Sequence, residues 1–148
     1  MMPVRIQQVG DAHIGQTVRI QGWLYNARSS GSLAFLEIRD GSGFIQAVAS
    51  KQSLPESVWQ TIETLTQESS VIVDGTVKAH PKKQGVYEVD VTELVLVQRA
   101  VDYPIAHKEH GPDFLLDNRH LWLRSKRQWA TQRIRDGVFE AVADFFHE

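Results

Sequence analysis

The sequence predicts a mainly β chain: a five-stranded Greek-key barrel with one helix between the third and fourth strands, followed by a linker and a C-terminal helix. Two observations support this fold class. Apolar and polar residues alternate with a period of two in five separate segments, which is typical of half-buried strands. One segment with helical spacing interrupts this series after the third strand. The predicted strands cover residues 16–26, 33–39, 44–49, 71–80 and 86–97.

The composition limits the classes of function that stay open. The 148 residues are 42% hydrophobic and 23% charged, as in ordinary globular proteins. The formal net charge is −2, whereas a protein that binds nucleic acid by charge alone is basic, so any such binding requires a local patch and specific contacts. The chain has no cysteine, which excludes disulfides and thiolate metal sites and fits a cytoplasmic protein.

Other signals are missing from the sequence. The first residues form no apolar signal core and no apolar run has the length of a membrane span, so we expect neither export nor membrane association. There is no phosphate-binding Gly-Lys-Ser/Thr loop, no dinucleotide fingerprint and no cluster of metal ligands. We therefore predict no catalytic residue, no metal site and no cofactor for this chain.

The first three predicted strands contain two backbone signals. Gly22, in the middle of the first strand, allows the sharp bend or close backbone approach that a small barrel needs. The sequence Asp-Gly-Ser-Gly at 40–43 tolerates positive φ, so it predicts a hairpin turn between the second and third strands.

Phe35 is predicted to lie on the polar face of the second strand, because Leu36 and the residues alternating with it are the ones that face the core. Gln46 is predicted on the matching face of the third strand. An aromatic ring among charged residues on an open sheet face is a stacking platform for a nucleic-acid base. The alternative is a single exposed aromatic side chain without a function, which is common in proteins.

The helix and the last two strands complete the predicted barrel. Ser53 and Glu56 have the spacing of a capping box, and the apolar residues after them repeat with helical spacing. Gly75 lies in the middle of the fourth strand, as Gly22 does in the first. The apolar parity of the fifth strand switches, which indicates a bulge near residues 92 and 93 that turns Glu93 outward.

The order strand, strand, strand, helix, strand, strand is that of an OB-fold, which binds oligonucleotides on the face of strands two and three. An SH3-like barrel would lack the helix at this position. We predict three parts: an OB-fold domain at 1–101, a linker at 102–113 that is interrupted by proline and glycine, and a helical region at 114–148.

Motifs along the whole chain support a narrower interpretation. The barrel carries Gln-Gly-Trp-Leu at 21–24, Arg28, and the hairpin motifs Phe-Leu-Glu-Ile-Arg-Asp and Gly-Phe-Ile-Gln within 35–46. Together these resemble the anticodon-binding domain of class IIb aminoacyl-tRNA synthetases, the enzymes for aspartate, asparagine and lysine. The tail, with Tyr-Pro-Ile, Lys-Glu-His-Gly and Arg-His-Leu-Trp-Leu-Arg-Ser within 103–125, resembles asparaginyl-tRNA synthetase. The aspartate and lysine enzymes usually carry Tyr-Leu-Asp-Leu in place of His-Leu-Trp-Leu.

This resemblance implies roles for residues of the barrel. The phenylalanine matching Phe35 stacks on the middle anticodon base, a uracil, and the glutamine matching Gln46 hydrogen-bonds to it. The arginine matching Arg28 contacts the anticodon, and the glutamate matching Glu93 reads the first base, a guanine. Three lysines are expected to contact phosphates: Lys78, Lys82 and Lys83.

The resemblance also implies what the chain lacks. The family's catalytic domain begins near Asp113, and residues 124–148 resemble the helix of its motif 1, which builds the dimer interface. Motifs 2 and 3, which bind ATP and the amino acid, have no counterpart here, so we expect no ligase activity from this chain alone. ATP and Mg²⁺ are expected in the full-length enzyme, a homodimer. The fragment itself is expected to be a monomer or a weak dimer through its C-terminal helix.

The leading prediction is therefore recognition of the GUU anticodon of the asparagine tRNA by the N-terminal part of an asparagine–tRNA ligase. Two alternatives stay open. A sequence-tolerant single-strand binder on the same fold would not discriminate a GUU loop from a scrambled loop. An interaction module that assembles through the C-terminal helix would self-associate without binding RNA.

Overall fold

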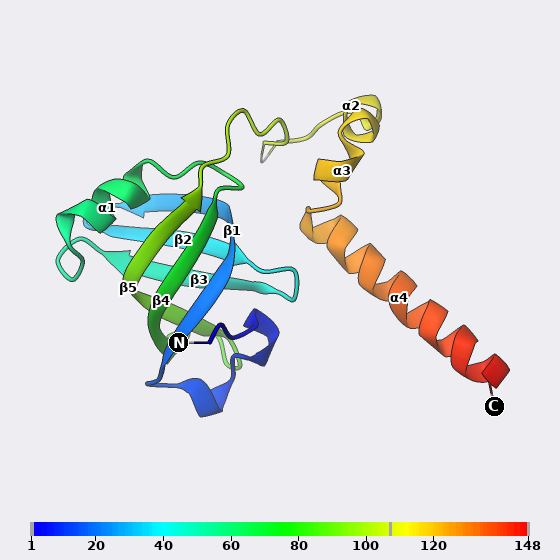
Figure 1. Cartoon of the computed structure of the whole chain (residues 1–148), viewed down its shortest axis with the longest axis horizontal. Helices are drawn as coiled ribbons and strands as arrows, with labels where there is room; N and C mark the ends of the chain where they lie inside the picture. The colour runs from blue at the N-terminus through cyan, green and yellow to red at the C-terminus, as the bar shows by residue number, and fades with distance from the viewer. Residues whose placement is uncertain (1, 107, 148) are drawn as a thin grey trace. The chain divides into compact units, whose positions relative to one another are not determined.

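The computed structural model describes residues 2–106 and 108–147; His107, in the predicted linker, lies outside the described residues. The chain divides after Asp102 into two compact units (Figure 1). The first unit holds the strands, and the second holds the helices that follow them.

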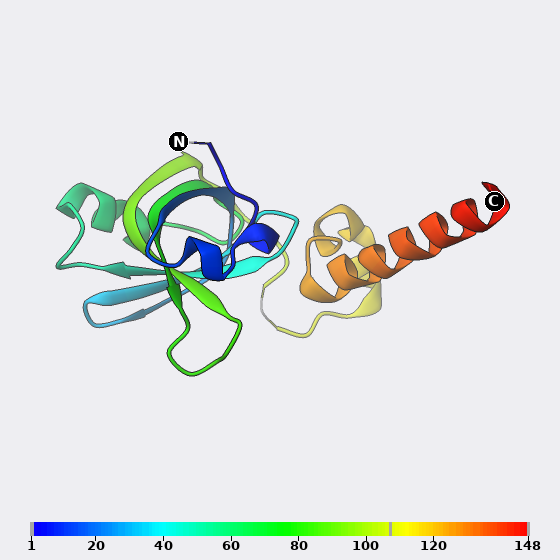
Figure 2. The same ribbon diagram turned by 90° about the horizontal axis from the view of Figure 1, so that it is seen from below.

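The first unit is a closed five-stranded barrel, which confirms the predicted fold class (Figures 1 and 2). The order around the barrel is β1-β2-β3-β5-β4, in which β3 and β5 run parallel and the other neighbours antiparallel. As predicted, a helix follows β3. The elements are η1 (Ile6–Gln8), η2 (Asp11–His13), β1 (Thr17–Ser30), β2 (Leu33–Arg39), β3 (Phe44–Ser50), α1 (Glu56–Glu63), β4 (Ser70–Ala79) and β5 (Tyr87–Gln98).

Alternate side chains of each strand fill the barrel. In β2, Leu36 and Ile38 are completely buried, whereas Phe35 is half-buried on the outer face. The predicted parity of this strand is therefore confirmed. Helix α1 adds Trp59 and Ile62 to the same core, as its apolar stripe predicted.

Two glycines allow strands to cross at the closest points of the barrel. A Cβ atom at Gly22 would lie 2.3 Å from the carbonyl oxygen of Arg39, and one at Gly75 would lie 2.3 Å from that of Asp90. Real Cβ atoms do not approach backbone oxygen so closely, so neither position accepts a side chain without a shift of the strands. The close backbone approach predicted for Gly22 is confirmed.

The hairpin turn between β2 and β3 is held by the carboxylate of Asp40. Its Oδ1 accepts hydrogen bonds from the backbone N–H groups of Ser42 (2.9 Å) and Gly43 (3.1 Å), and Gly41 adopts a φ of +85°. Its Oδ2 accepts a bond of 2.8 Å from the backbone N–H of Ile6 in η1. The turn thereby fixes the register of the hairpin, in which Phe35 pairs with Val48.

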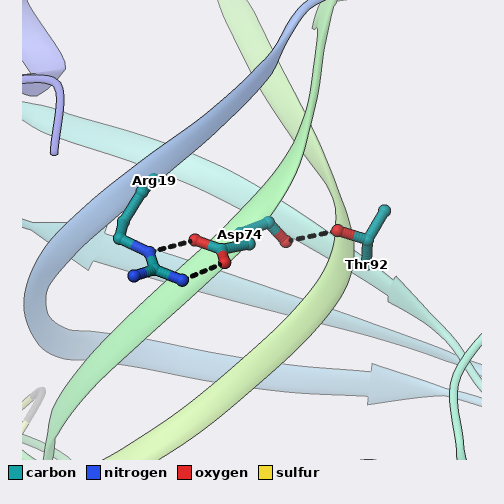
Figure 3. Close-up of polar contacts among 3 residues, drawn as sticks. All are labelled: Arg19, Asp74 and Thr92. Atoms are coloured by element: carbon teal, nitrogen blue, oxygen red, sulfur yellow. Dashed lines mark hydrogen bonds and ion pairs between the residues drawn. The ribbon is translucent and has the colours of Figure 1, made fainter. Parts of the chain in front are cut away.

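A bidentate ion pair joins β1 to β4 on the outside of the barrel (Figure 3). Nε and NH2 of Arg19 donate to the two carboxylate oxygens of Asp74 at 2.8 and 2.6 Å. This bonding, offset by partial burial, lowers the pKa of Asp74 below its ordinary value. The hydroxyl of Thr92 donates to the backbone carbonyl of Asp74 at 3.1 Å, and the register of β5 shifts at this point. The predicted bulge near Thr92 and Glu93 is thus confirmed, and both side chains are exposed.

The expected capping box of α1 is wrong. Pro55 occupies the N-cap position, the helix begins at Glu56, and no side chain caps it. Proline favours this start because its fixed φ suits a helix end and its missing N–H costs no hydrogen bond there.

The second unit consists of α2 (Pro112–Asp117), α3 (Arg119–Trp122) and α4 (Lys126–His147). The predicted C-terminal helix is therefore present. None of the described residues of α4 is buried, and its apolar stripe is exposed, with Val138 57% and Phe145 73% accessible. No helix in the described part of the chain is long and apolar enough to cross a membrane.

Candidate nucleic-acid interface

A hollow of about 360 Å³ lies on the outer face of the barrel. Residues of β1, β2, β3 and β5 line it, together with residues of the loop between β4 and β5. Figure 2 shows this loop projecting from the barrel below β4 and β5. The lining residues are Asn26, Arg28, Phe35, Glu37, Phe44, Ile45, Gln46, His80, Lys83, Val86, Tyr87 and Glu88.

Phe35 and Arg28 contact each other within the hollow. They are cross-strand partners on β2 and β1, and the guanidinium carbon of Arg28 lies 5.0 Å from the centroid of the Phe35 ring. This distance is that of a cation–π contact. NH2 of Arg28 also donates to Oε1 of Gln46 at 3.2 Å. Arg28 is therefore held between the ring and the amide.

Gln46 is oriented from both sides by charged groups. Its Oε1 accepts from Arg28, and its Nε2 donates to Oε1 of Glu88 at 2.6 Å. Glu88 reaches this position because β3 and β5 pair in parallel with Gln46 opposite Glu88. The two charged neighbours set which end of the amide is oxygen and which is nitrogen.

The charges of the hollow balance one another. Arg28 and Lys83 are cationic, and Glu37 and Glu88 are anionic. A phosphate-binding site would be mainly cationic, whereas the edges of bases carry both hydrogen-bond donors and acceptors. The mixture of an aromatic ring, an amide and both signs of charge suits a base more than a phosphate.

The structure brings only part of the predicted site together. Arg28, Phe35, Gln46 and Lys83 line the hollow. Lys78 does not line it and pairs instead with Asp90 on β5, whose ion pair is largely exposed to solvent. Lys82 lies exposed in the loop between β4 and β5, also outside the lining.

Glu93 lies elsewhere on β5. Its Cα partner across the ladder is Asp74, and its charge adds a small upward contribution to the pKa of Arg19, which is raised mainly by Asp74. Glu93 lies five positions after Glu88 on β5, on the order of 15 Å along a strand. Glu93 does not line the hollow; Glu88 does.

Sequence reasoning missed Glu88 and Glu37 as residues of the site. The parity of β2 places Glu37 on the same face as Phe35, so that signal was available. Glu88 joins the site only through the parallel pairing of β3 with β5, two strands that are far apart in sequence.

The barrel and its aromatic, polar hollow define a nucleic-acid-binding module. The comparison with family models agrees: residues 18–97 match the anticodon-binding family described as "OB-fold nucleic acid binding domain". This match covers more than half of the chain, and the chain belongs to this family.

Proteins similar to this chain over nearly its whole length include asparagine–tRNA ligases. The ligase of Sorangium cellulosum is 54% identical over 136 residues, which are 91% of this chain and 30% of the relative. That of Pelotomaculum thermopropionicum is 46% identical over 148 residues, 100% of this chain and 34% of the relative. A crystal structure of the asparaginyl-tRNA synthetase from Pyrococcus horikoshii with asparaginyl-adenylate matches with a TM-score of 0.89 and 34% identity, covering 98% of this chain and 34% of that one.

These similarities confirm the predicted resemblance to asparaginyl-tRNA synthetase. The chain spans about a third of the length of the ligases it matches. It therefore corresponds to a part of such a ligase, the part that contains the anticodon-binding barrel.

Proposed function

We propose that the barrel binds the anticodon loop of the asparagine tRNA and reads the anticodon GUU, as part of an asparagine–tRNA ligase. The observation that carries this proposal is the arrangement of Arg28, Phe35, Gln46 and Glu88 in one hollow on the outer face of β1, β2, β3 and β5. A splayed-out base needs a flat ring to stack on and an oriented pair of donor and acceptor groups at its edge. Both are present within this hollow.

The middle base, uracil, stacks on Phe35 in this proposal. The amide of Gln46 then meets the edge of uracil, which offers one N–H donor and carbonyl acceptors. Gln46 is preoriented by Arg28 and Glu88, so the free protein has already lost much of the rotational freedom of this side chain. Preorientation favours discrimination, because a base with the wrong edge leaves a polar group unpaired.

The first base, guanine, requires a carboxylate that accepts from its N1–H and amino group. The resemblance assigned this role to Glu93, and that assignment stays a prediction. We propose Glu88 for the role, because Glu88 lines the hollow beside Gln46, whereas Glu93 lies with Arg19 and Asp74. Among the described residues, the bonds and ion pairs of Glu88 all end on Oε1, which leaves Oε2 for a donor on the base.

Phosphate contacts make a smaller contribution in this proposal. Lys82 and Lys83 in the exposed loop contact the backbone of the anticodon loop, and Lys78 does so only in competition with Asp90. With about three phosphates neutralised, the logarithm of the affinity falls by about 2 for each tenfold rise in salt. A much steeper slope indicates a non-specific electrostatic binder.

The remaining parts follow the predicted division of the chain. We propose that residues 1–101 bind the tRNA, that 102–113 are a linker and that 114–148 begin the catalytic domain of a homodimeric cytoplasmic ligase. The exposed apolar stripe of α4 then belongs to the dimer interface, and this chain alone forms at most a weak dimer through it. ATP and Mg²⁺ act in the ligase outside this chain, which needs no cofactor to bind tRNA.

Paired substitutions test which residues read the bases. We expect Glu88→Gln to lower the preference for a GUU stem-loop over one with a substituted first base about tenfold, and Glu93→Gln to leave it unchanged. Gln46→Ala should lower the preference at the middle base instead. The affinities are measured by titration of fluorescent stem-loops in one buffer.

The same titrations separate the other interpretations. Equal loss of affinity for every loop in the Gln46 and Glu88 variants indicates a sequence-tolerant binder. A chain that binds no loop but self-associates with rising concentration is an interaction module. A loss with Glu93→Gln and none with Glu88→Gln restores the assignment made from the resemblance.

A further inference from the structure

His80 lies at the edge of the hollow, where β4 ends and the exposed loop to β5 begins. Its backbone N–H donates to the carbonyl of Val86 at 2.8 Å, which closes the base of the loop. The loop is otherwise exposed, yet only 20% of the His80 side chain is accessible to solvent. Its ring is therefore fixed between the loop backbone and the wall of the hollow.

The loop backbone selects one form of the His80 ring. The backbone N–H of Lys82 donates to Nδ1 at 3.0 Å, so Nδ1 must present its lone pair. A neutral imidazole then carries its hydrogen on Nε2. This nitrogen faces Oε1 of Glu88 at 3.5 Å. The loop thus directs one N–H group of His80 toward the carboxylate of Glu88.

A line of polar groups results that crosses the hollow from the loop to β1. His80 faces Oε1 of Glu88, the same oxygen accepts from Gln46 at 2.6 Å, and Gln46 accepts from Arg28 at 3.2 Å. Only 14% of the Glu88 side chain is accessible, so its contacts are only weakly screened by water. Gln46 donates a hydrogen bond to Oε1, and Nε2 of His80 lies 3.5 Å from the same oxygen, so both groups favour a carboxylate with Oε1 toward the protein.

We propose that His80 is a positioning residue for base recognition: it holds the Glu88 carboxylate with Oε1 toward the protein and Oε2 toward the bound base. This inference rests on the proposed function, and it adds a residue that contacts no base itself. Among the described residues Gln46 makes the one side-chain hydrogen bond to Glu88, and the contact with His80 is the second restraint, so without His80 that bond alone orients the carboxylate. The first-base preference then falls while stacking on Phe35 is unaffected.

Two substitutions distinguish the contact that Nδ1 of His80 makes with Lys82 from the contact that Nε2 makes with Glu88. In His80→Asn, the amide oxygen takes the place of Nδ1 and still accepts from Lys82, but no atom reaches Glu88. In His80→Gln, the longer side chain places its amide nitrogen near the position of Nε2 and still donates to Glu88. The two variants differ by one methylene group, so each is a matched control for the other.

The experiment titrates the 148-residue chain with a GUU stem-loop and with a loop whose first base is substituted. We expect His80→Asn to lower the preference for guanine about 3- to 10-fold, the value of one ordinary polar contact. His80→Gln should retain the preference within about twofold. In a Glu88→Gln background, His80→Asn should cause no further loss, because His80 acts through Glu88. Both single variants should melt at the temperature of the unchanged protein.

Each other result overturns the proposal. Equal losses in the Asn and Gln variants, or an Asn variant that keeps its preference, show that contact with Glu88 has no role. An Asn variant that loses affinity equally for both loops shows that His80 contacts phosphate or only shapes the loop. If the unchanged chain shows no preference for GUU, the proposed function fails together with this inference; if it shows one and His80→Asn keeps it, the role of His80 alone fails.

Discussion

The two units of this chain use apolar residues in opposite ways. The barrel encloses them: Ile20, Leu36 and Val77 are each at most 1% exposed, and they belong to one core that all five strands share. In α4 none of the described residues is buried, although its apolar residues repeat with helical spacing. The barrel buries its apolar residues in its own core, whereas α4 leaves its apolar residues exposed.

The difference shows which unit holds its side chains in fixed positions. Arg28, Gln46 and Glu88 of the polar line lie on strands of the barrel. The residues that alternate with Gln46 along β3 are buried in the core. Rigid strands hold such groups more accurately than a helix without a packing partner does.

The largest effect is expected where two strands cross. Gly75→Ala places a Cβ 2.3 Å from the carbonyl oxygen of Asp90 and 2.5 Å from a methyl group of Val89. We expect it to lower the free energy of unfolding of the barrel by about 3 kcal/mol or more, because the strands must separate. Denaturant unfolding measures it, followed by tryptophan fluorescence in a background where Trp122 and Trp129 of the second unit are phenylalanine. An unchanged midpoint would show that the barrel closes differently at this point.

The two faces of β2 should separate stability from binding. Leu36→Ala removes a completely buried side chain and should lower the free energy of unfolding by about 2–5 kcal/mol. Phe35→Ala should change stability little but weaken binding of the GUU stem-loop by about 1–3 kcal/mol, the value of one base stack. Melting curves and titrations of both variants test this. A large loss of stability in the Phe35 variant means that its ring belongs to the core.

Much of this arrangement follows from local sequence patterns. Alternation predicted the strands and the outward position of Phe35, the change of parity predicted the bulge at Thr92, and Gly22 marked a close strand crossing. Each signal acts within one strand. Steric contacts and burial within one strand determine these features, so the residues of that strand are sufficient to predict them.

The features that sequence reasoning missed arise between distant segments. Glu88 enters the site because β5 pairs in parallel with β3, and no pattern within either strand specifies that register. No local pattern distinguishes His80 from the basic residues that follow it in the loop. Its contacts with Lys82 and Glu88 depend on the fold of the loop against β5. The helix start at α1 was misjudged because Pro55 sets it without a side-chain cap.

A smaller effect is expected at the ion pair in Figure 3, and it depends on pH. Hydrogen bonding to Arg19 lowers the pKa of Asp74 in the folded state, so the pair stabilises the protein fully above the unfolded pKa, near pH 4. This contribution is lost as the pH falls through the lower, folded pKa. The stability difference between the unchanged protein and Asp74→Asn should therefore shrink as the pH drops below about 4. Urea unfolding at several pH values measures it, and a difference that grows toward acid pH contradicts the assignment.

Gly137→Ala in α4 is the matched counterpart of Gly75→Ala. A Cβ at Gly137 meets no atom within 4 Å, and alanine is the better helix former. We expect this change to stabilise the helix by about 0.5–1 kcal/mol and to leave the barrel unchanged. Far-ultraviolet circular dichroism follows the helix, and tryptophan fluorescence follows the barrel when Trp122 and Trp129 are replaced by phenylalanine, which leaves Trp23 and Trp59. Destabilisation of the barrel by this change would show that the two units are not independent.

The smallest effect is expected from removing the second unit. The hydrogen bonds of Thr66 and Ser69 with Ala100 lie within residues 1–102, so the end of β5 stays anchored. A chain ending at Asp102 should keep the free energy of unfolding of the barrel within about 0.5 kcal/mol. It should also keep its affinity for the GUU stem-loop. Loss of folding would show that the helices complete the barrel.

The central claim is that the hollow around Phe35, Gln46 and Glu88 is the surface that contacts the anticodon. Amide and side-chain NMR shifts of the 148-residue chain, recorded during titration with the GUU stem-loop, test it most directly. The account predicts that the largest changes occur at these three residues and in the loop containing His80, while the groups around Asp74 stay unchanged. Shifts concentrated around Asp74 and Glu93, with none in the hollow, would contradict it.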